Sequence, residues 1–233
     1  MKNLKDALSF LTIVKFYSDD FDAVGAMNAF AYVGLLIGCV LAGVYHLLGD
    51  SFVMPIAVVV LWVVLTGALH LDGVMDTADA LFSHRDRERK LEIMKDSRSG
   101  AMAVVTAILL ILIKYESISQ LSNFWLLIVI PGMARAGMVW TMKTMPYVRA
   151  EGTGKMFFES ENSAWMYQFV PVLVLALFLG LKPALMLIAV LCATVLILQW
   201  WYRKQIGGIT GDLLGAQCEV TETVLLLFAG ALL

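Results

Sequence analysis

The stretch Phe52-Val-Met-Pro-Ile-Ala-Val-Val-Val-Leu-Trp-Val-Val-Leu-Thr-Gly-Ala-Leu-His-Leu71 decides the fold class. It contains no Asp, Glu, Lys or Arg, and it matches the roughly 20 residues with which a helix crosses a ~30 Å hydrocarbon core. The whole chain shares this bias, since 60% of its 233 residues are hydrophobic and 15% are charged. Soluble domains have about 45–50% apolar and about 25% charged residues. The composition therefore excludes an ordinary soluble domain and predicts an integral membrane protein.

Seven apolar segments of this kind follow one another along the chain. Their apolar runs are continuous rather than alternating, which favours helices, because a helix satisfies its own backbone hydrogen bonds in lipid. We predict an all-α fold: a polytopic membrane helical bundle of about seven transmembrane helices (six to eight), in a single integral-membrane domain over residues 1–233. The predicted spans are Ala29–Gly49, Phe52–Leu71, Gly100–Tyr115, Phe124–Met142, Ala164–Leu181, Pro183–Tyr202 and Leu213–Leu233.

The N-terminal segment predicts one more helix, which lies on the membrane instead of crossing it. Its apolar residues recur at helical spacing among charged ones, at Leu4, Ala7, Leu8, Leu11 and Val14. This pattern is typical of an amphipathic interfacial helix.

The lysines and arginines predict the orientation. With the N-terminus inside and seven alternating spans, 14 of the 17 fall on the inside, Lys114 and Lys182 fall outside, and Arg135 lies within the fourth span. Lys and Arg are enriched in cytoplasmic loops. We therefore predict a multi-pass protein of the cytoplasmic (inner) membrane whose long polar loops face the cytoplasm.

The second span runs directly into His70-Leu-Asp-Gly-Val-Met-Asp-Thr-Ala-Asp79. The spacing of Asp72, Asp76 and Asp79 places three carboxylates on one face of a helix. Such a group persists where a cation lies between its members, and oxygen ligands suit Mg²⁺ or Mn²⁺. We predict a metal site with catalytic carboxylates here, against the alternative of an ordinary acidic helix cap. For His70, a catalytic role and an interfacial hydrogen-bonded histidine are equally good interpretations.

Basic residues near this motif suit a phosphorylated substrate. Residues 83–98 combine six Lys or Arg with four acids, which suits a phosphate-binding surface. The alternative interpretation is an amphipathic surface helix that lies on anionic lipid. Arginine pairs well with phosphate oxygens. The candidates are Lys95, Arg98 and Arg149 as phosphate-binding residues, Asp96 as a metal ligand and Ser97 as a further polar site residue.

Further polar residues lie inside the apolar segments. Arg135 lies deep in the fourth span, where a charge costs at least about 2.5 kcal/mol. We therefore predict that it faces a partner or a polar cavity. We also count it among the candidate phosphate-binding residues. Glu219 and Glu222 share one helix face after a glycine-rich turn that ends at Asp212. We predict Asp212 as a metal ligand and the two glutamates as polar site residues; a purely structural turn is the alternative.

Four blocks of sequence resemble the adenosylcobinamide-GDP ribazoletransferase, or cobalamin synthase, family. They cover nearly the whole chain in order: His70–Asp79, Asp86–Gly100, Tyr147–Gly154 with Phe157, and Gly207–Ala216 with Glu219 and Glu222. The resemblance implies a catalytic domain that joins adenosylcobinamide-GDP to α-ribazole or its 5′-phosphate, releasing GMP and giving adenosylcobalamin or its 5′-phosphate. It also implies Mg²⁺, with Mn²⁺ as a substitute, attack of a ribose hydroxyl on the pyrophosphate, and a location in the lipid bilayer of the cytoplasmic membrane.

The chain departs from that family in two places. Ile13-Val-Lys15 follows Phe10-Leu-Thr12 where the family has an arginine and prolines, so only Lys15 is left as an N-terminal substrate contact. Met75 and Ala80 stand where the family has smaller residues. Neither change removes a carboxylate.

Two other functions compete with this one. A CDP-alcohol phosphotransferase-like phospholipid enzyme also clusters aspartates, but this chain has Thr77-Ala78 in place of the Ala-Arg of that motif. A transporter would carry intramembrane charges too, but we find no internal repeat. The sequence indicates no nucleic-acid partner and leaves a homo-oligomer open.

Overall fold

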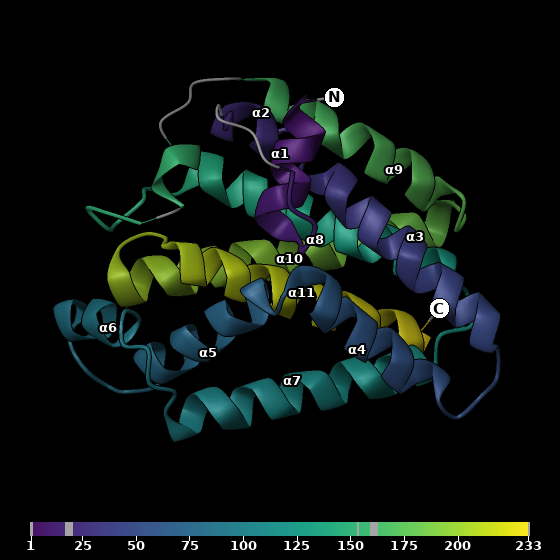
Figure 1. Cartoon of the computed structure of the whole chain (residues 1–233), viewed down its shortest axis with the longest axis horizontal. Coiled ribbons are helices and arrows are strands. Elements are labelled where there is room, and N and C mark those ends of the chain that lie inside the picture. The colour runs from purple at the N-terminus through teal and green to yellow at the C-terminus, as the bar shows by residue number, and fades with distance from the viewer. Residues whose placement is uncertain (1, 17–20, 153, 159–162, 233) are drawn as a thin grey trace.

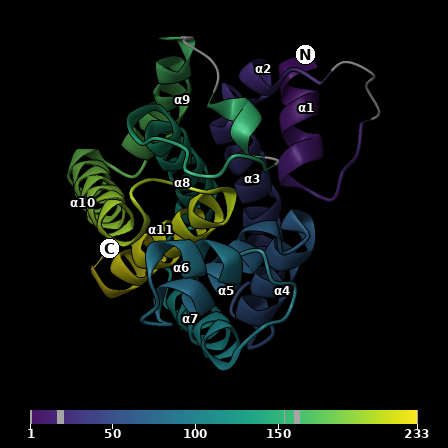
Figure 2. The ribbon, with the colours of Figure 1, turned by 90° about the vertical axis from the view of Figure 1, so that its left-hand side faces the viewer.

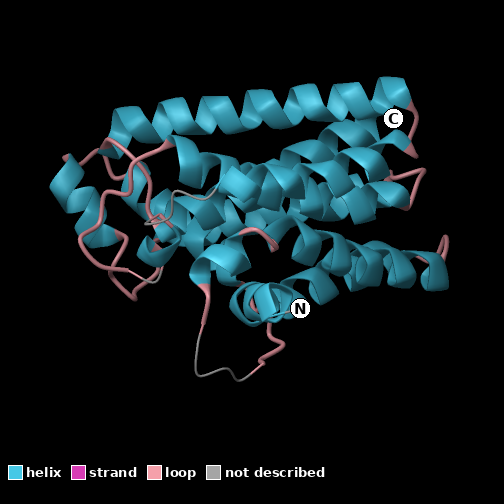
Figure 3. Ribbon diagram, turned by 90° about the horizontal axis from the view of Figure 1, so that it is seen from above, coloured by secondary structure: helices cyan, strands magenta, loops and turns pink. Residues whose placement is uncertain are grey.

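The computed structural model describes residues 2–16, 21–152, 154–158 and 163–232. Figure 3 shows helices and loops in this part of the chain, and an isolated bridge joins Tyr147 to Ile209. The predicted all-α fold is confirmed. The elements are α1 (Lys2–Leu11), α2 (Ala23–Met27), α3 (Phe30–Leu48), α4 (Met54–Thr66), α5 (Leu69–Leu81), α6 (Arg87–Ile93), α7 (Ala101–Ser119), α8 (Trp125–Thr144), the 3₁₀ helices η1 (Lys155–Phe157) and η2 (Ser163–Gln168), α9 (Phe169–Leu177), α10 (Leu181–Ile206) and α11 (Gly211–Leu232).

Within these ranges, five helices are long and apolar enough to cross a membrane, namely α3, α7, α8, α10 and α11. They run along the longest direction of the molecule (Figure 1). α8 and α11 are mostly buried, whereas fewer than half of the residues of α3, α7 and α10 are buried and each of these helices carries exposed apolar side chains. Exposed apolar faces of this size suit contact with lipid, which confirms a polytopic membrane bundle.

Small residues bring α3 and α8 into close contact. A Cβ atom at Gly34 would lie 2.3 Å from the Pro131 carbonyl oxygen, and one at Gly38 would lie 2.4 Å from that of Leu127. Only glycine allows the two backbones to approach this closely, which is a common way of packing helices in membranes.

The second predicted span, Phe52–Leu71, is wrong as a single straight helix. α4 ends at Thr66 and α5 begins at Leu69, and their axes differ by 88°, which gives the inverted V in Figure 1. Gly67 and Ala68 have φ values of 58° and 57°, a backbone conformation that only glycine adopts without strain. The Ile13 amide donates to the Leu65 carbonyl at 2.9 Å, so the N-terminal segment satisfies a carbonyl that the end of α4 leaves free.

The predicted count of seven spans is not confirmed. Besides the five long helices, the broken pair α4–α5 adds up to one span, and the apolar run Trp165–Leu177 is shorter than a full crossing. The third span was predicted to end at Tyr115, with Lys114 outside, and this is corrected: α7 continues to Ser119, and Lys114 is buried within it. α1 forms the predicted N-terminal helix and packs against α2 and α3.

Candidate active site

A cavity of about 210 Å³ lies where α5, α8 and α11 meet. α5 and α11 lie side by side, as the end view in Figure 2 shows. A Cβ atom at Gly73 would lie 2.6 Å from the Asp212 carbonyl oxygen, and one at Gly215 would lie 3.3 Å from the His70 Cα atom. Glycine at both positions therefore allows the two helices to bring their acidic residues together.

The carboxylates of three aspartates gather at this contact. Asp72 and Asp212 line the cavity, and Asp76 interacts electrostatically with both of them. The Arg149 guanidinium forms an ion pair with Asp212 at 2.6 Å. In the described part of the chain, the side chains of Asp72 and Asp76 make no hydrogen bond and no ion pair. Two carboxylates thus remain without a matching cation.

The loop that carries Arg149 is held in place by backbone pairing. The Val148 amide donates to the Ile209 carbonyl at 3.0 Å, and the Ile209 amide donates to the Pro146 carbonyl at 2.9 Å. This pairing ties the segment after α8 to the turn before α11, which is why the third and fourth blocks of the sequence meet. Burial raises the pKa of the neighbouring Tyr147, and Asp212 adds to that rise while Arg149 opposes it, so its phenol stays neutral and able to donate.

Asp79 has a different partner from the other acids. Its carboxylate accepts hydrogen bonds from the Gly100 amide and, at 2.9 Å, from the Ala103 amide in the first turn of α7. The first amides of a helix have no partner inside the helix, and an acidic side chain there satisfies them and complements the helix dipole. The structure therefore gives Asp79 a capping contact; its predicted role as metal ligand and catalytic residue stays a prediction.

We expect Asp79→Ala to lower the free energy of unfolding by about 1 kcal/mol, the usual effect of removing a helix cap. Turnover should fall only to the extent that loss of the cap moves α7. Thermal melting and kinetics of the same sample measure both effects, with Asp79→Asn, which keeps an acceptor oxygen, as the control. Complete loss of turnover at an unchanged melting temperature would instead indicate a metal ligand.

Lys95, Asp96, Ser97 and Arg98 lie together on the loop between α6 and α7, and none of them lines the cavity. The Arg98 guanidinium donates to the Asp96 carboxylate at 2.6 and 2.9 Å, and this contact lowers the pKa of Asp96 to about 2. Both side chains are solvent-exposed and pair with each other. Their predicted roles, as metal ligand and phosphate-binding residue, require this pair to open.

Arg135, Glu219 and Glu222 lie inside the bundle together with Lys114, and we call these four residues the intramembrane charge cluster. The Lys114 ammonium lies 2.5 Å from Glu219 and 2.7 Å from Glu222, and Arg135 lies 2.8 Å from Glu222. Two cations and two anions balance, as a low-dielectric interior requires. Arg135 was predicted to face a partner or a cavity, and it has a partner; it is fully buried, so the geometry does not support its predicted phosphate-binding role.

Sequence reasoning missed Lys114 and most of the cavity wall. The sequence predicts Lys114 outside the membrane at the end of a span, although the apolar pattern resumes at Ile118. The apolar walls include Met138 and Met142, which no motif distinguishes from ordinary core residues, and Phe10, which begins the N-terminal stretch compared with the family. Phe157, which follows the third block, also lines the cavity.

A divalent metal ion fits the acidic residues only together with other ligands. No group of three or more His, Cys, Asp or Glu among the described residues is arranged to hold a metal ion by itself. Mg²⁺ in enzymes is commonly bound by one or two carboxylates, substrate phosphates and water. Asp72 and Asp76, with Asp212 beside them, provide suitable carboxylate oxygens for such a shared site.

The helical bundle and its acidic cavity define an integral membrane enzyme. A family model described as cobalamin-5-phosphate synthase matches residues 3–230. The chain therefore belongs to the cobalamin-5-phosphate synthase family and is an enzyme of the transferase class.

Curated relatives carry the name adenosylcobinamide-GDP ribazoletransferase. The chain is 39% identical to that of Thermosynechococcus vestitus over 210 residues, which cover 87% of this chain and 84% of the relative. It is 35% identical to that of Desulforamulus reducens (95% and 93% covered) and 33% identical to that of Alkaliphilus oremlandii (98% and 97% covered). No solved structure matches the chain.

Proposed function

We propose that the protein joins adenosylcobinamide-GDP to α-ribazole, or to its 5′-phosphate, with release of GMP. The observation that carries this proposal is the meeting of Asp72, Asp76 and Asp212 beside Arg149 at a cavity. The names of the relatives supply the two substrates. Membership of the family also favours this reaction over phospholipid synthesis and over transport.

The reaction has chemical requirements that these residues meet. A ribose hydroxyl attacks the pyrophosphate phosphorus that carries the cobinamide, the P–O bond to GMP breaks, and the hydroxyl proton passes to a carboxylate. Asp72 and Asp76 are the candidates to accept that proton, because neither side chain is engaged in a hydrogen bond or an ion pair within the described residues. A bound Mg²⁺ would neutralise negative charge on the pyrophosphate, and Asp72, Asp76 and Asp212 would hold it.

Arginine and lysine side chains complete the proposed site. Arg149 already lies next to an acid of the site and can hold a phosphate oxygen when substrate competes for it. Lys95, Ser97 and Arg98 are exposed on a neighbouring loop, and we propose that they contact phosphates of the bound substrate. Glu219 and Glu222 support the site from within the bundle.

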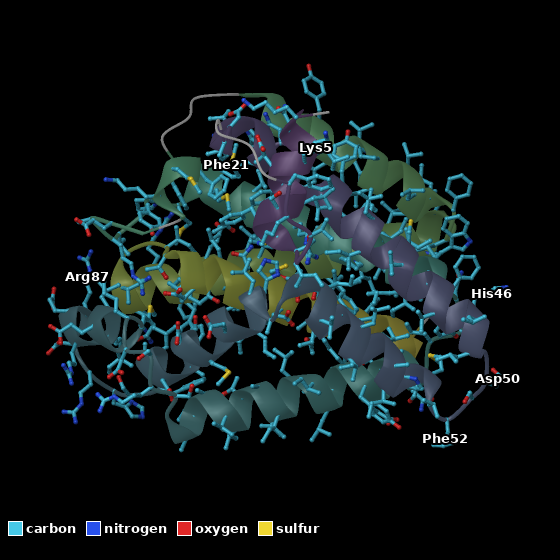
Figure 4. The ribbon with its side chains drawn as sticks, viewed as in Figure 1. Lys5, Phe21, His46, Asp50, Phe52 and Arg87 are labelled. Carbon is cyan, nitrogen blue, oxygen red and sulfur yellow. The ribbon has the colours of Figure 1, made fainter. Side chains whose placement is uncertain are left out.

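We propose that the acidic end of the bundle faces the cytoplasm. Figure 4 labels Arg87 at that end, and Asp50 and Phe52 at the other. The Lys- and Arg-rich segment 83–98 belongs to the Arg87 end, and loops rich in these residues stay on the cytoplasmic side.

The test of this function is GMP release by the purified protein in liposomes. We expect adenosylcobinamide-GDP and α-ribazole phosphate to give GMP and a cobalamin product in equal amounts with Mg²⁺, and neither product with EDTA. Full activity in EDTA would remove the metal from the proposal. A folded sample that forms no product with Mg²⁺ or Mn²⁺ and either form of ribazole would overturn the function, and an uptake assay on the same liposomes would then test transport.

A further inference from the structure

The wall of the cavity contains two chemically different kinds of side chain. Asp72 and Asp212 contribute carboxylates to its wall, whereas Phe10, Phe157, Met138 and Met142 contribute aromatic rings and thioethers. Phe10 and Phe157 meet edge to face, with ring centroids 4.8 Å apart, and Phe157, Met138 and Met142 are buried. A largely apolar pocket with a few polar groups is the usual form of a site for a small organic molecule.

His70 is a buried polar side chain in the wall that has no hydrogen-bond partner among the described residues. Its side chain is 2% exposed, and neither ring nitrogen has a hydrogen-bond partner among the described residues. A buried polar group left unpaired costs about 1–3 kcal/mol, so a group of this kind in a cavity wall indicates a missing ligand. Lys114 and Arg135 both act on His70 electrostatically and would repel a metal cation there. A ligand that forms a hydrogen bond with the imidazole therefore fits this position better than a metal ion.

We propose that this cavity binds the aromatic base of the ribazole substrate, with His70 donating a hydrogen bond to the free ring nitrogen of the base. The proposal rests on the proposed function and adds the place of one substrate. The base of α-ribazole is a dimethylated benzimidazole, which is flat and apolar and has a single ring nitrogen free to accept a hydrogen bond. Aromatic rings and methionine sulfur pack well against such a ring system.

The other parts of the two substrates fit this cavity poorly. Guanine has donors and acceptors along several edges, and most would stay unpaired between Phe10, Phe157, Met138 and Met142. The corrin ring is far too large for a cavity of about 210 Å³. A base held among the apolar residues also leaves its ribose toward Asp72 and Asp212, where the attacking hydroxyl is needed.

Binding measured without turnover tests the proposal. Equilibrium dialysis with the full chain in detergent uses α-ribazole and the matching indole riboside, which has a carbon in place of the free nitrogen, with EDTA and without adenosylcobinamide-GDP. We expect the wild type to bind the indole riboside about tenfold more weakly, the effect of one buried hydrogen bond. His70→Leu should bind α-ribazole about tenfold more weakly than the wild type and should bind the indole riboside as the wild type does.

Two methionine variants test the location. Met142→Trp fills the cavity and should abolish binding of both ribosides. Met102→Trp, the same change at an exposed position of α7, should leave binding unchanged; melting temperatures show that each variant is folded. Equal binding of both ribosides by the wild type, unchanged binding by Met142→Trp, or equal competition by guanosine would each overturn the inference. The binding assay needs no reaction, so it can fail independently of the turnover assay. If the protein releases GMP but does not bind the base in the cavity, the inference is wrong and the proposed function stands. If it binds the base in the cavity but releases no GMP, the proposed function alone is wrong.

Discussion

Asp76→Asn should reduce GMP release at least about 100-fold, the lower end of what a positioned acid–base group contributes. The amide has nearly the same shape as the carboxylate, but it carries no charge for a metal ion and accepts no proton. The side chain of Asp76 makes no hydrogen bond or ion pair within the described residues, so its replacement should leave the fold intact. The change removes the repulsion that Asp76 exerts on Asp72 and on Asp212, so the melting temperature should not fall.

The measurement is a turnover assay on liposomes that contain matched amounts of each variant. The control is Asp50→Asn, the same chemical change at the opposite end of the bundle (Figure 4), which should keep full activity. The residual activity of Asp76→Asn should also need a higher Mg²⁺ concentration for half saturation, since loss of a group that supports a metal site weakens it about 10–100-fold. Near-normal turnover at the usual Mg²⁺ concentration would remove Asp76 from the proposed site.

Much of the fold follows from the continuity of the apolar runs. The segments predicted at Ala29–Gly49 and Phe124–Met142 correspond to α3 and α8, because an apolar run of this length, even with the single charge of Arg135, has no other stable form in lipid. The break between α4 and α5 could not be predicted in this way. Gly67 and Ala68 are as apolar as their neighbours, and the change of direction depends on a left-handed backbone that hydropathy does not encode.

For the candidate site too, the sequence pattern predicts only part of what the structure shows, as the acidic motif illustrates. Helical spacing predicted that Asp72, Asp76 and Asp79 share a face, but it does not say what each carboxylate meets. Asp79 meets the start of α7, which is 21 residues further along the chain. Asp72 and Asp76 meet Asp212 on α11 instead. Both contacts depend on helix packing, so only the structure separates the capping acid from the two free ones.

The intramembrane charge cluster should be the most sensitive part of the fold. We expect Lys114→Met to lower the free energy of unfolding by about 3–5 kcal/mol, the usual effect of removing one partner from a buried ion pair. Glu219 would lose its ion-pair partner, and Glu222 would keep only Arg135. The interior of the bundle would then hold one negative charge too many.

A second substitution should reverse most of this loss. In Lys114→Met with Glu219→Gln, the charges balance again, because the pair between Arg135 and Glu222 remains. Thermal unfolding in lipid nanodiscs measures both variants, with Lys182→Met as the control, since it makes the same change at an exposed position of α10. If the double variant were as unstable as the single one, the cation–π contact of the Lys114 ammonium with Trp62, whose ring centroid lies 4.4 Å away, would explain the stability better than charge balance. Recovery of stability in the double variant would mean that these charged residues are retained because they neutralise one another. Glu219 and Glu222 would then affect the active site only indirectly, by fixing the position of α11.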